Sequence, residues 1–235
     1  MDNINSQKFR KAEAVSCTAL ASTFHYFDFE TDSPLIFQPG QYIEVQVADD
    51  RINAYSIAGH EGLLKFNLLV DVKPGGPGSK FFEHLKIGNR ISFLGPFGTF
   101  TLKLDDRAEH LLFLATGCGI TPLKCMIDSA LKEKNCRLPI TLYFGLSYSG
   151  DVFWQDVLIK LSKEYPNFNF KIAVWKPDQT WQGETGFITE FLKEDFPDAS
   201  QLSAYLCGNK DMIADATQIL LERGCLKKRI YTEKY

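Results

Sequence analysis

The segment ATGCGITP, residues 115–122, could bind a phosphate group because it carries two glycines and precedes a helical pattern. Gly117 and Gly119 let the backbone approach a ligand closely, and the first turn of the helix directs free N–H groups toward the same place. Pro122 suits that first turn. Alone, the segment fits an ordinary strand-to-helix turn equally well, since position 122 breaks the G-x-G-x-x-G pattern of dinucleotide sites.

A second glycine-rich segment, KPGGPGS at residues 73–79, places three glycines before Ser79. We expect Ser79 to cap a short helix over 79–85 and the turn to offer a second cradle for an anion. A plain surface loop is the alternative.

Two apolar strands end in polar or reactive side chains. Cys207 directly precedes Gly208 at the end of one strand, where a ligand could contact the thiol, although a buried structural cysteine is the more common case. Tyr55 and Ser56 interrupt another strand within RINAYSIAGHEG, residues 51–62. A core strand would favour a branched residue at position 56, so this pattern indicates a flat, polar-edged ligand beside the strand.

The elements that must position these residues change in character near residue 106. Before it, short segments with a period of two alternate with turns rich in glycine and proline, which is typical of a small barrel or sandwich. After it, apolar strands alternate with helices, which predicts a doubly wound parallel sheet. Strands are expected at 22–30, 41–47, 63–70, 90–94, 110–117, 139–146, 168–175, 203–208 and 228–235, and helices at 121–134, 151–165 and 210–224.

Composition argues against several classes of protein. The chain has 235 residues, 45% of them hydrophobic, which is enough for two domains with real cores. A net charge of −3 gives no basic field for nucleic acid, and neither a membrane span nor a signal peptide is expected. The six scattered cysteines lack the spacing of a metal site, so we expect a cytoplasmic protein that holds no metal or iron–sulfur cluster of its own.

Seven motifs resemble, in order, those of the ferredoxin–NADP reductase family of flavoenzymes, over about residues 12–235. They are FQPGQY, NAYSIAG, GGPGS and LGPFGTF, then TGCGITP, YLCGNKDM and YTEKY. The resemblance implies an antiparallel β-barrel domain that binds FAD, residues 1–106, followed by an α/β doubly wound parallel-sheet domain that binds NAD(P), residues 107–235.

The resemblance also implies roles for individual residues. The Tyr55 ring would flank the flavin isoalloxazine, and Ser56 would direct its hydroxyl at flavin N5, the atom that accepts the hydride. Ser79 and the neighbouring amides would hold the flavin phosphates.

In the second half, Cys207 would lie beside the nicotinamide and Glu233 would help its positioning and its proton traffic. Tyr235 would cover the other flavin face and yield to nicotinamide, acting as a gate. The catalytic residues implied are thus Ser56, Cys207, Glu233 and Tyr235. The cofactor-binding positions are Arg51, Asn53, Ala54, Tyr55, Ser56, Ile57, Leu69, Val70, Gly76, Gly78, Ser79, Gly117, Cys118, Gly119, Thr121, Pro122, Gly145, Ser147, Cys207, Gly208, Met212 and Tyr235.

Two positions depart from the family pattern, and both bear on cofactor affinity. Asn53 stands where the family has the arginine that meets the flavin phosphate, and Arg51, two residues earlier on the same strand face, could replace it. Cys118 stands where the family has threonine, and a thiol is a weaker hydrogen-bonding group than a hydroxyl.

The coenzyme expected is NADH rather than NADPH. A 2′-phosphate usually calls for arginine or lysine at the strand tip near the adenosine ribose, and positions 146–150 have neither. Ser147, Tyr148 and Ser149 could still hydrogen-bond a phosphate, with Lys176 close by.

The function predicted is an FAD-dependent NAD(P)H oxidoreductase that passes electrons to a small redox protein: a ferredoxin, a flavodoxin or an oxygenase component. One alternative is a reductase that releases free reduced flavin. Another is a non-catalytic flavin or nucleotide sensor, which the presence of Ser56, Cys207 and Glu233 argues against.

Overall fold

The computed structural model describes residues 8–73, 75–104 and 108–234. The chain divides into two compact units, Met1–Thr101 and Leu102–Tyr235. The boundary expected after residue 106 lies within 105–107, outside the described residues. Within the described parts of the chain, no helix has the length and apolar character needed to cross a membrane.

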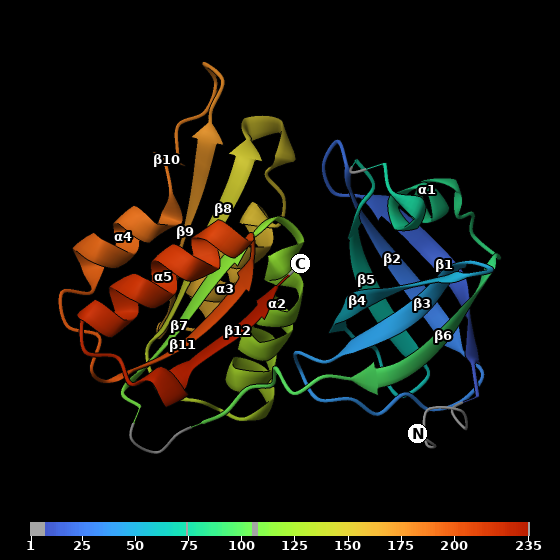
Figure 1. The fold of residues 1–235 in the computed structure, drawn as a ribbon, viewed down its shortest axis with the longest axis horizontal. Coiled ribbons are helices and arrows are strands. Elements are labelled where there is room, and N and C mark those ends of the chain that lie inside the picture. The colour runs from blue at the N-terminus through green and yellow to red at the C-terminus, as the bar shows by residue number, and fades with distance from the viewer. Residues whose placement is uncertain (1–7, 74, 105–107, 235) are drawn as a thin grey trace. The chain divides into compact units, whose positions relative to one another are not determined.

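The first unit is a closed antiparallel barrel with strand order β1-β2-β5-β4-β3-β6 (Figure 1). Its strands are β1 (Arg10–Ala19), β2 (Phe24–Thr31), β3 (Tyr42–Ala48), β4 (Arg51–Gly59), β5 (Lys65–Asp71) and β6 (Arg90–Phe97). One helix, α1 (Pro77–His84), lies between β5 and β6 in sequence. Inward side chains fill the barrel, most of them aromatic or branched, among them Phe27, Phe29, Phe66 and Phe93. The predicted barrel is therefore confirmed, and the sandwich is not formed.

The barrel differs from the sequence expectation in two places. β1 was not expected, because its inward positions are the small residues Ala12 and Ala14 and because a bulge between Ala14 and Ser16 breaks its alternation. α1 begins at Pro77 with Gly76 as its N-cap, so Ser79 lies inside the first turn rather than at the cap. Proline at the first helical position, with its fixed φ, accounts for the earlier start.

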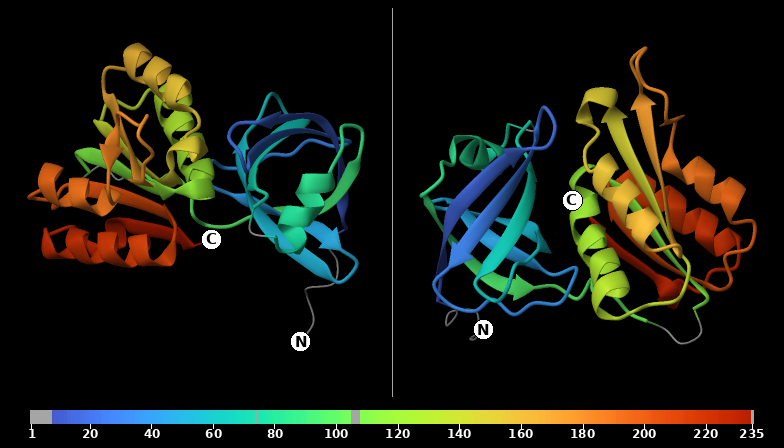
Figure 2. Two further views of the ribbon diagram at one scale, coloured as in Figure 1. Left: turned by 90° about the horizontal axis from the view of Figure 1, so that it is seen from above. Right: turned by 180° about the vertical axis from the view of Figure 1, so that it is seen from behind.

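The second unit is a six-stranded parallel sheet with order β10-β9-β8-β7-β11-β12. Its strands are β7 (His110–Thr116), β8 (Ile140–Tyr148), β9 (Phe168–Lys176), β10 (Glu184–Thr185), β11 (Leu202–Gly208) and β12 (Ile230–Lys234). Its helices are α2 (Ile120–Asp128), α3 (Gln155–Glu164), α4 (Ile188–Asp195) and α5 (Lys210–Glu222). The sheet separates α2 and α3 from α4 and α5, as the view from above shows (Figure 2), so the predicted doubly wound fold is confirmed.

Burial in this unit explains why its strands have no alternating pattern. Both faces of β7 are covered: Leu112 and Leu114 pack toward α4 and α5, while Leu111 and Phe113 lie on the other face, and all four are fully buried. Helix α2 is shorter than the expected 121–134, because its last part, Ser129–Glu133, continues as a π-helical turn.

The strand order reverses at β7. β8 pairs with one side of β7, whereas β11, which comes much later in the sequence, pairs with the other. The carboxyl ends of β7 and β11 therefore form the topological switch point, where open α/β sheets bind their ligands.

Candidate functional site

In the barrel, the side chains of β4 divide between two faces. Arg51, Asn53 and Tyr55 share one face, and Ser56 lies on the other, as the period of two requires. Tyr55 is half-buried, and its ring packs edge-on against Phe82 of α1 with 4.8 Å between centroids. The side chains of Tyr55 and Ser56, the two residues expected to contact the flavin ring system, thus point to opposite faces of the strand.

The first turn of α1 meets β4 at Gly78. A Cβ at this position would lie 2.6 Å from Asn53 Nδ2 and closer still to the Tyr55 hydroxyl, distances that real Cβ atoms do not show. Glycine lets the amide of Asn53 and the phenol of Tyr55 come this close to the helix in their present positions. This contact brings together Asn53, Tyr55 and Gly78, three of the positions that the resemblance assigns to the cofactor.

This arrangement suits a phosphate. The N-terminus of α1 has no side-chain cap, and Pro77 at its first position has no N–H, so the amides of the first turn are not occupied by a capping side chain. The helix end carries partial positive charge and favours an anion. The Asn53 amide and the Tyr55 hydroxyl add two hydrogen-bond donors beside it. The residues present therefore fit the phosphate of a flavin nucleotide, with Asn53 in the place of the family arginine.

The other predicted flavin contacts lie on β4 and β5. Ile57 and Val70 belong to the barrel core, so their side chains are packed inward. Leu69 is 4% exposed but lies outside that core cluster. Ala54 and Arg51 are exposed, and Arg51 stands at the start of β4, two residues before Asn53 on the same face.

In the α/β unit, two glycines at the switch point allow the segments after β7 and β11 to come into close contact. A Cβ on Gly119 would lie 2.5 Å from the carbonyl carbon of Cys207 and 2.8 Å from the Cα of Gly208. Gly208 has a φ of +138°, which a residue with a side chain rarely adopts, and its Cβ would lie 2.9 Å from the backbone nitrogen and oxygen of Thr116. The backbones after β7 and β11 are thus in direct contact.

A hydrogen bond joins the same two loops. The backbone N–H of Asn209 donates to the hydroxyl of Thr116 over 2.8 Å. Asn209 then caps α5, its side-chain oxygen accepting the N–H of Asp211 over 2.7 Å. Thr116 and Asn209 were not among the predicted site residues. The sequence could have indicated both residues, because Thr116 directly precedes the glycine turn and Asn209 directly precedes α5.

One buried polar atom at the switch point has no partner within the described residues. Thr121, in the first turn of α2, is 1% exposed, and its hydroxyl makes no hydrogen bond there. A buried hydroxyl without a partner costs free energy, so such groups in native sites usually meet a ligand or water. Together with Gly117 and Gly119 at the start of α2, this orphaned hydroxyl fits a bound pyrophosphate.

Cys207 lies at the tip of β11, fully buried, in register with Glu233 of β12. Burial first, and the nearby Glu233 carboxylate and Cys118 second, raise the pKa of the Cys207 thiol far above its usual range. The group is therefore a neutral thiol at physiological pH and offers a compact S–H instead of a nucleophilic thiolate. The structure thus brings Cys207, Glu233 and Cys118 together.

The end of β8 carries the residues expected near the adenosine ribose. Gly145 pairs with Thr116, and Ser147 is exposed two residues further along. Pro122 and Met212 are buried in α2 and α5, which makes them supports of the neighbouring turns. Tyr235 lies outside the described residues, so its gating role stays a prediction.

Exposed aromatic rings at the end of β9 were not anticipated. Trp175 and Phe187 are 49% and 56% exposed and stack with 5.8 Å between their centroids. The Lys176 ammonium lies 4.0 Å from the centre of the Trp175 ring. Nothing in the sequence pattern distinguishes these rings from core aromatics.

Comparisons with known proteins agree with both units. Residues 11–102 match the family described as the oxidoreductase FAD-binding domain, and residues 113–218 match the oxidoreductase NAD-binding domain. The electron transfer component of toluate 1,2-dioxygenase from Pseudomonas putida is 30% identical over 203 residues, which is 86% of this chain and 59% of that protein. The chain spans about three fifths of the length of the curated relatives it matches.

Solved structures show the same two-domain fold. The cytochrome P450 reductase GcoB from Amycolatopsis superposes with a TM-score of 0.88 at 26% identity, covering 97% of this chain and 69% of that one. A ferredoxin NADP+ reductase from Neisseria gonorrhoeae with bound FAD and NADP superposes with a TM-score of 0.83 at 21% identity, covering 97% and 98% of the two chains.

Proposed function

The chain belongs to the ferredoxin–NADP reductase family of flavoenzymes, and on that premise we propose that it oxidises a reduced nicotinamide coenzyme and delivers the electrons singly to a redox protein. Bound FAD would supply the step from a two-electron donor to one-electron acceptors. The observation that carries the proposal is the presence of two phosphate cradles, one in each unit. Each contains a glycine in close contact with its neighbours: Gly78 meets the Asn53 and Tyr55 side chains in the barrel, and Gly119 meets the backbone of Cys207 and Gly208 in the α/β unit.

The residues of this chain would bind and orient rather than react. Asn53, Tyr55 and the first turn of α1 would hold the flavin phosphate. The turn Gly117–Gly119 would hold the pyrophosphate of the coenzyme. Cys207 would place an uncharged thiol beside the nicotinamide, since a thiolate there would compete with hydride transfer as a nucleophile. Ser56, buried on the other face of β4, keeps its predicted role at flavin N5.

NADH is the coenzyme that the strand tips favour. Positions 146–150 offer no cation, and the nearest candidate, Lys176, rests on the Trp175 ring. Withdrawing an ammonium from such a ring costs about 0.5–1 kcal/mol at an exposed site. The Ser149 hydroxyl accepts the backbone N–H of Asp178 over 2.9 Å, so a carboxylate-bearing residue lies beside a serine that could otherwise hydrogen-bond a 2′-phosphate.

The acceptor proposed is an oxygenase component, a ferredoxin or a flavodoxin. The support is the printed role of relatives such as the toluate dioxygenase electron transfer component. The scattered spacing of the six cysteines supports a reducing compartment such as the cytoplasm.

The decisive experiment is to purify the protein, record its visible spectrum, and measure flavin per chain. We expect one FAD per chain, reduced by NADH faster than by NADPH, with electrons passing on to cytochrome c or ferricyanide. Failure to bind added FAD refutes the proposal. Turnover that depends on added free flavin, with no flavin retained, would identify a flavin reductase instead.

A further inference from the structure

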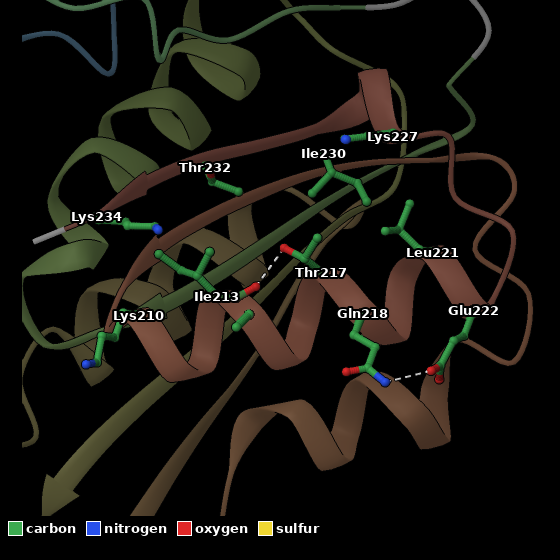
Figure 3. A pocket seen from close by; sticks show the side chains of 11 residues that line it. Lys210, Ile213, Thr217, Gln218, Leu221, Glu222, Lys227, Ile230, Thr232 and Lys234 are labelled. Carbon is green, nitrogen blue, oxygen red and sulfur yellow. Dashed lines mark hydrogen bonds between the residues drawn. The ribbon is translucent and has the colours of Figure 1, made fainter.

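The α/β unit carries a hollow between α5 and β12, which runs from the end of β11 along the length of α5. Its volume is about 580 Å³. The lining residues are Lys210, Ile213, Ala214, Thr217, Gln218, Leu221, Glu222, Lys227, Ile230, Thr232 and Lys234. We call it the α5–β12 groove. β12 is the last strand of the sheet in the order of the described residues, so the groove opens at the sheet margin (Figure 3).

The middle of the groove is apolar. Ile213 forms part of the buried core, Ile230 is half-buried, and Leu221 is 42% exposed. A single exposed leucine is common on protein surfaces, but here Leu221 and Ile230 share one hollow whose floor is the buried Ile213. The exposed parts of these two side chains would gain from being covered.

The ends of the groove are positively charged. Lys210 and Lys234 lie at one end and Lys227 at the other (Figure 3). Within the described residues, none of these three lysines takes part in an ion pair. The one carboxylate of the lining, on Glu222, accepts the Gln218 amide over 2.9 Å. A cationic hollow on a chain of net charge −3 complements an acidic partner.

We propose that the α5–β12 groove docks an acidic amphipathic segment of a partner protein. Its apolar side chains would cover the aliphatic middle, and its carboxylates would meet the lysines at both ends. α5 has 13 residues, so the wall is about 20 Å long at 1.5 Å per residue. This length matches a helix of three to four turns, whose apolar face fits a groove of this kind.

The test uses the full chain, labelled with nitrogen-15, and a blocked 14-residue peptide. The peptide carries leucine at helical spacing and glutamate elsewhere, and a control peptide carries lysine in place of glutamate. We expect the acidic peptide to shift the amide signals of the groove residues and the lysine peptide to leave them unchanged. Binding is read without the coenzyme reaction, so the result is independent of the proposed function.

Charge reversal provides the matched comparison. The triple change Lys210→Glu, Lys227→Glu, Lys234→Glu should weaken acidic-peptide binding roughly tenfold or more, since three charge contacts are lost together. The control triple, Lys160→Glu, Lys163→Glu, Lys193→Glu, alters exposed lysines on α3 and α4 by the same charge and should leave binding near the parent value. If the groove triple fails to fold, Lys227→Glu alone should weaken binding by roughly two- to fivefold.

Three outcomes would overturn the proposal: no binding of the acidic peptide, equal binding of the lysine peptide, or equal weakening in both triple variants. Sedimentation of the free protein provides a fourth. A concentration-dependent dimer that shifts the same amide signals would assign the groove to a second copy of this chain instead.

Discussion

Replacing Gly119 with alanine is expected to damage the coenzyme site, although alanine can adopt the backbone conformation of this position. Gly119 has φ −59° and ψ −17°, helical values that alanine adopts readily. Alanine in a helical position is even favoured over glycine by about 0.5–1 kcal/mol. Any loss must therefore come from the added Cβ, which would lie 2.5 Å from the carbonyl carbon of Cys207 and 2.8 Å from the Cα of Gly208.

The clash outweighs the gain in helix propensity because the atoms that it meets are backbone. They cannot rotate away as the end of a side chain could, so the loops after β7 and β11 must separate. Overpacking of this kind costs about 1–3 kcal/mol, and the bond from the Asn209 N–H to the Thr116 hydroxyl, worth about 0.5–1.5 kcal/mol, would be stretched with it. After the propensity gain is subtracted, the free energy of unfolding should fall by about 1–3 kcal/mol.

Urea unfolding and calorimetric titration with NAD⁺ measure the two consequences. Coenzyme binding should weaken by roughly tenfold, the equivalent of about 1.4 kcal/mol, because the pyrophosphate cradle is displaced. For the unfolding measurement, Gly150→Ala is the matched control, since a Cβ there meets nothing within 4 Å. If Gly119→Ala unfolds within about 0.5 kcal/mol of the parent, the surface-substitution range, and binds NAD⁺ as the parent does, the assigned backbone contact is wrong.

Four further predictions concern single residues. Arg51→Ala should weaken FAD binding by about 1.5–3 kcal/mol if Arg51 replaces the missing family arginine, and an unchanged dissociation constant would place the substitute elsewhere. Burial lowers the pKa of His110, so the unfolded chain takes up the proton more readily. Stability should therefore be complete above pH of about 6.5 and fall as the pH drops below it, a slope that His110→Gln should reduce in unfolding curves. Iodoacetamide should label exposed Cys17 much faster than buried Cys207 in the ligand-free protein, and mass spectrometry showing equal rates would contradict the assigned burial. Tyr235→Ser should tighten binding of both NADH and NADPH and reduce discrimination between them, and titrations identical to the parent would exclude a gate.

The parts of the site that sequence reasoning found are those that depend on glycine. A side chain at Gly119 or Gly208 would collide with the backbone of the neighbouring segment, and one at Gly78 would meet side chains of β4, so their residue type carries the geometry directly. A strand with one buried face alternates with a period of two, whereas a strand buried on both faces is apolar throughout. The change between these two patterns along the chain predicted the two fold classes.

Other features depend on contacts that no local pattern encodes. Thr116 and Asn209 are 93 residues apart, and their hydrogen bond exists only because β7 and β11 become neighbours. β1 was missed because its inward alanines gain their burial from aromatic rings on other strands. Lys176 is positioned by the ring beside it, a contact that a sequence scan for phosphate-binding cations does not reveal.

The position of β7 at the centre of its sheet also sets an order of events during synthesis. β8 emerges soon after β7 and can pair with it at once, whereas β11 begins only at Leu202. Closing such a distant pair carries the entropy of a long loop, and pairings of this kind form slowly. A nascent chain that ends before residue 202 can thus complete its barrel while half of the coenzyme crevice has not yet been made. One face of β7 and its open edge would remain exposed for that interval, which makes this strand the part of the chain most in need of protection from aggregation while translation finishes.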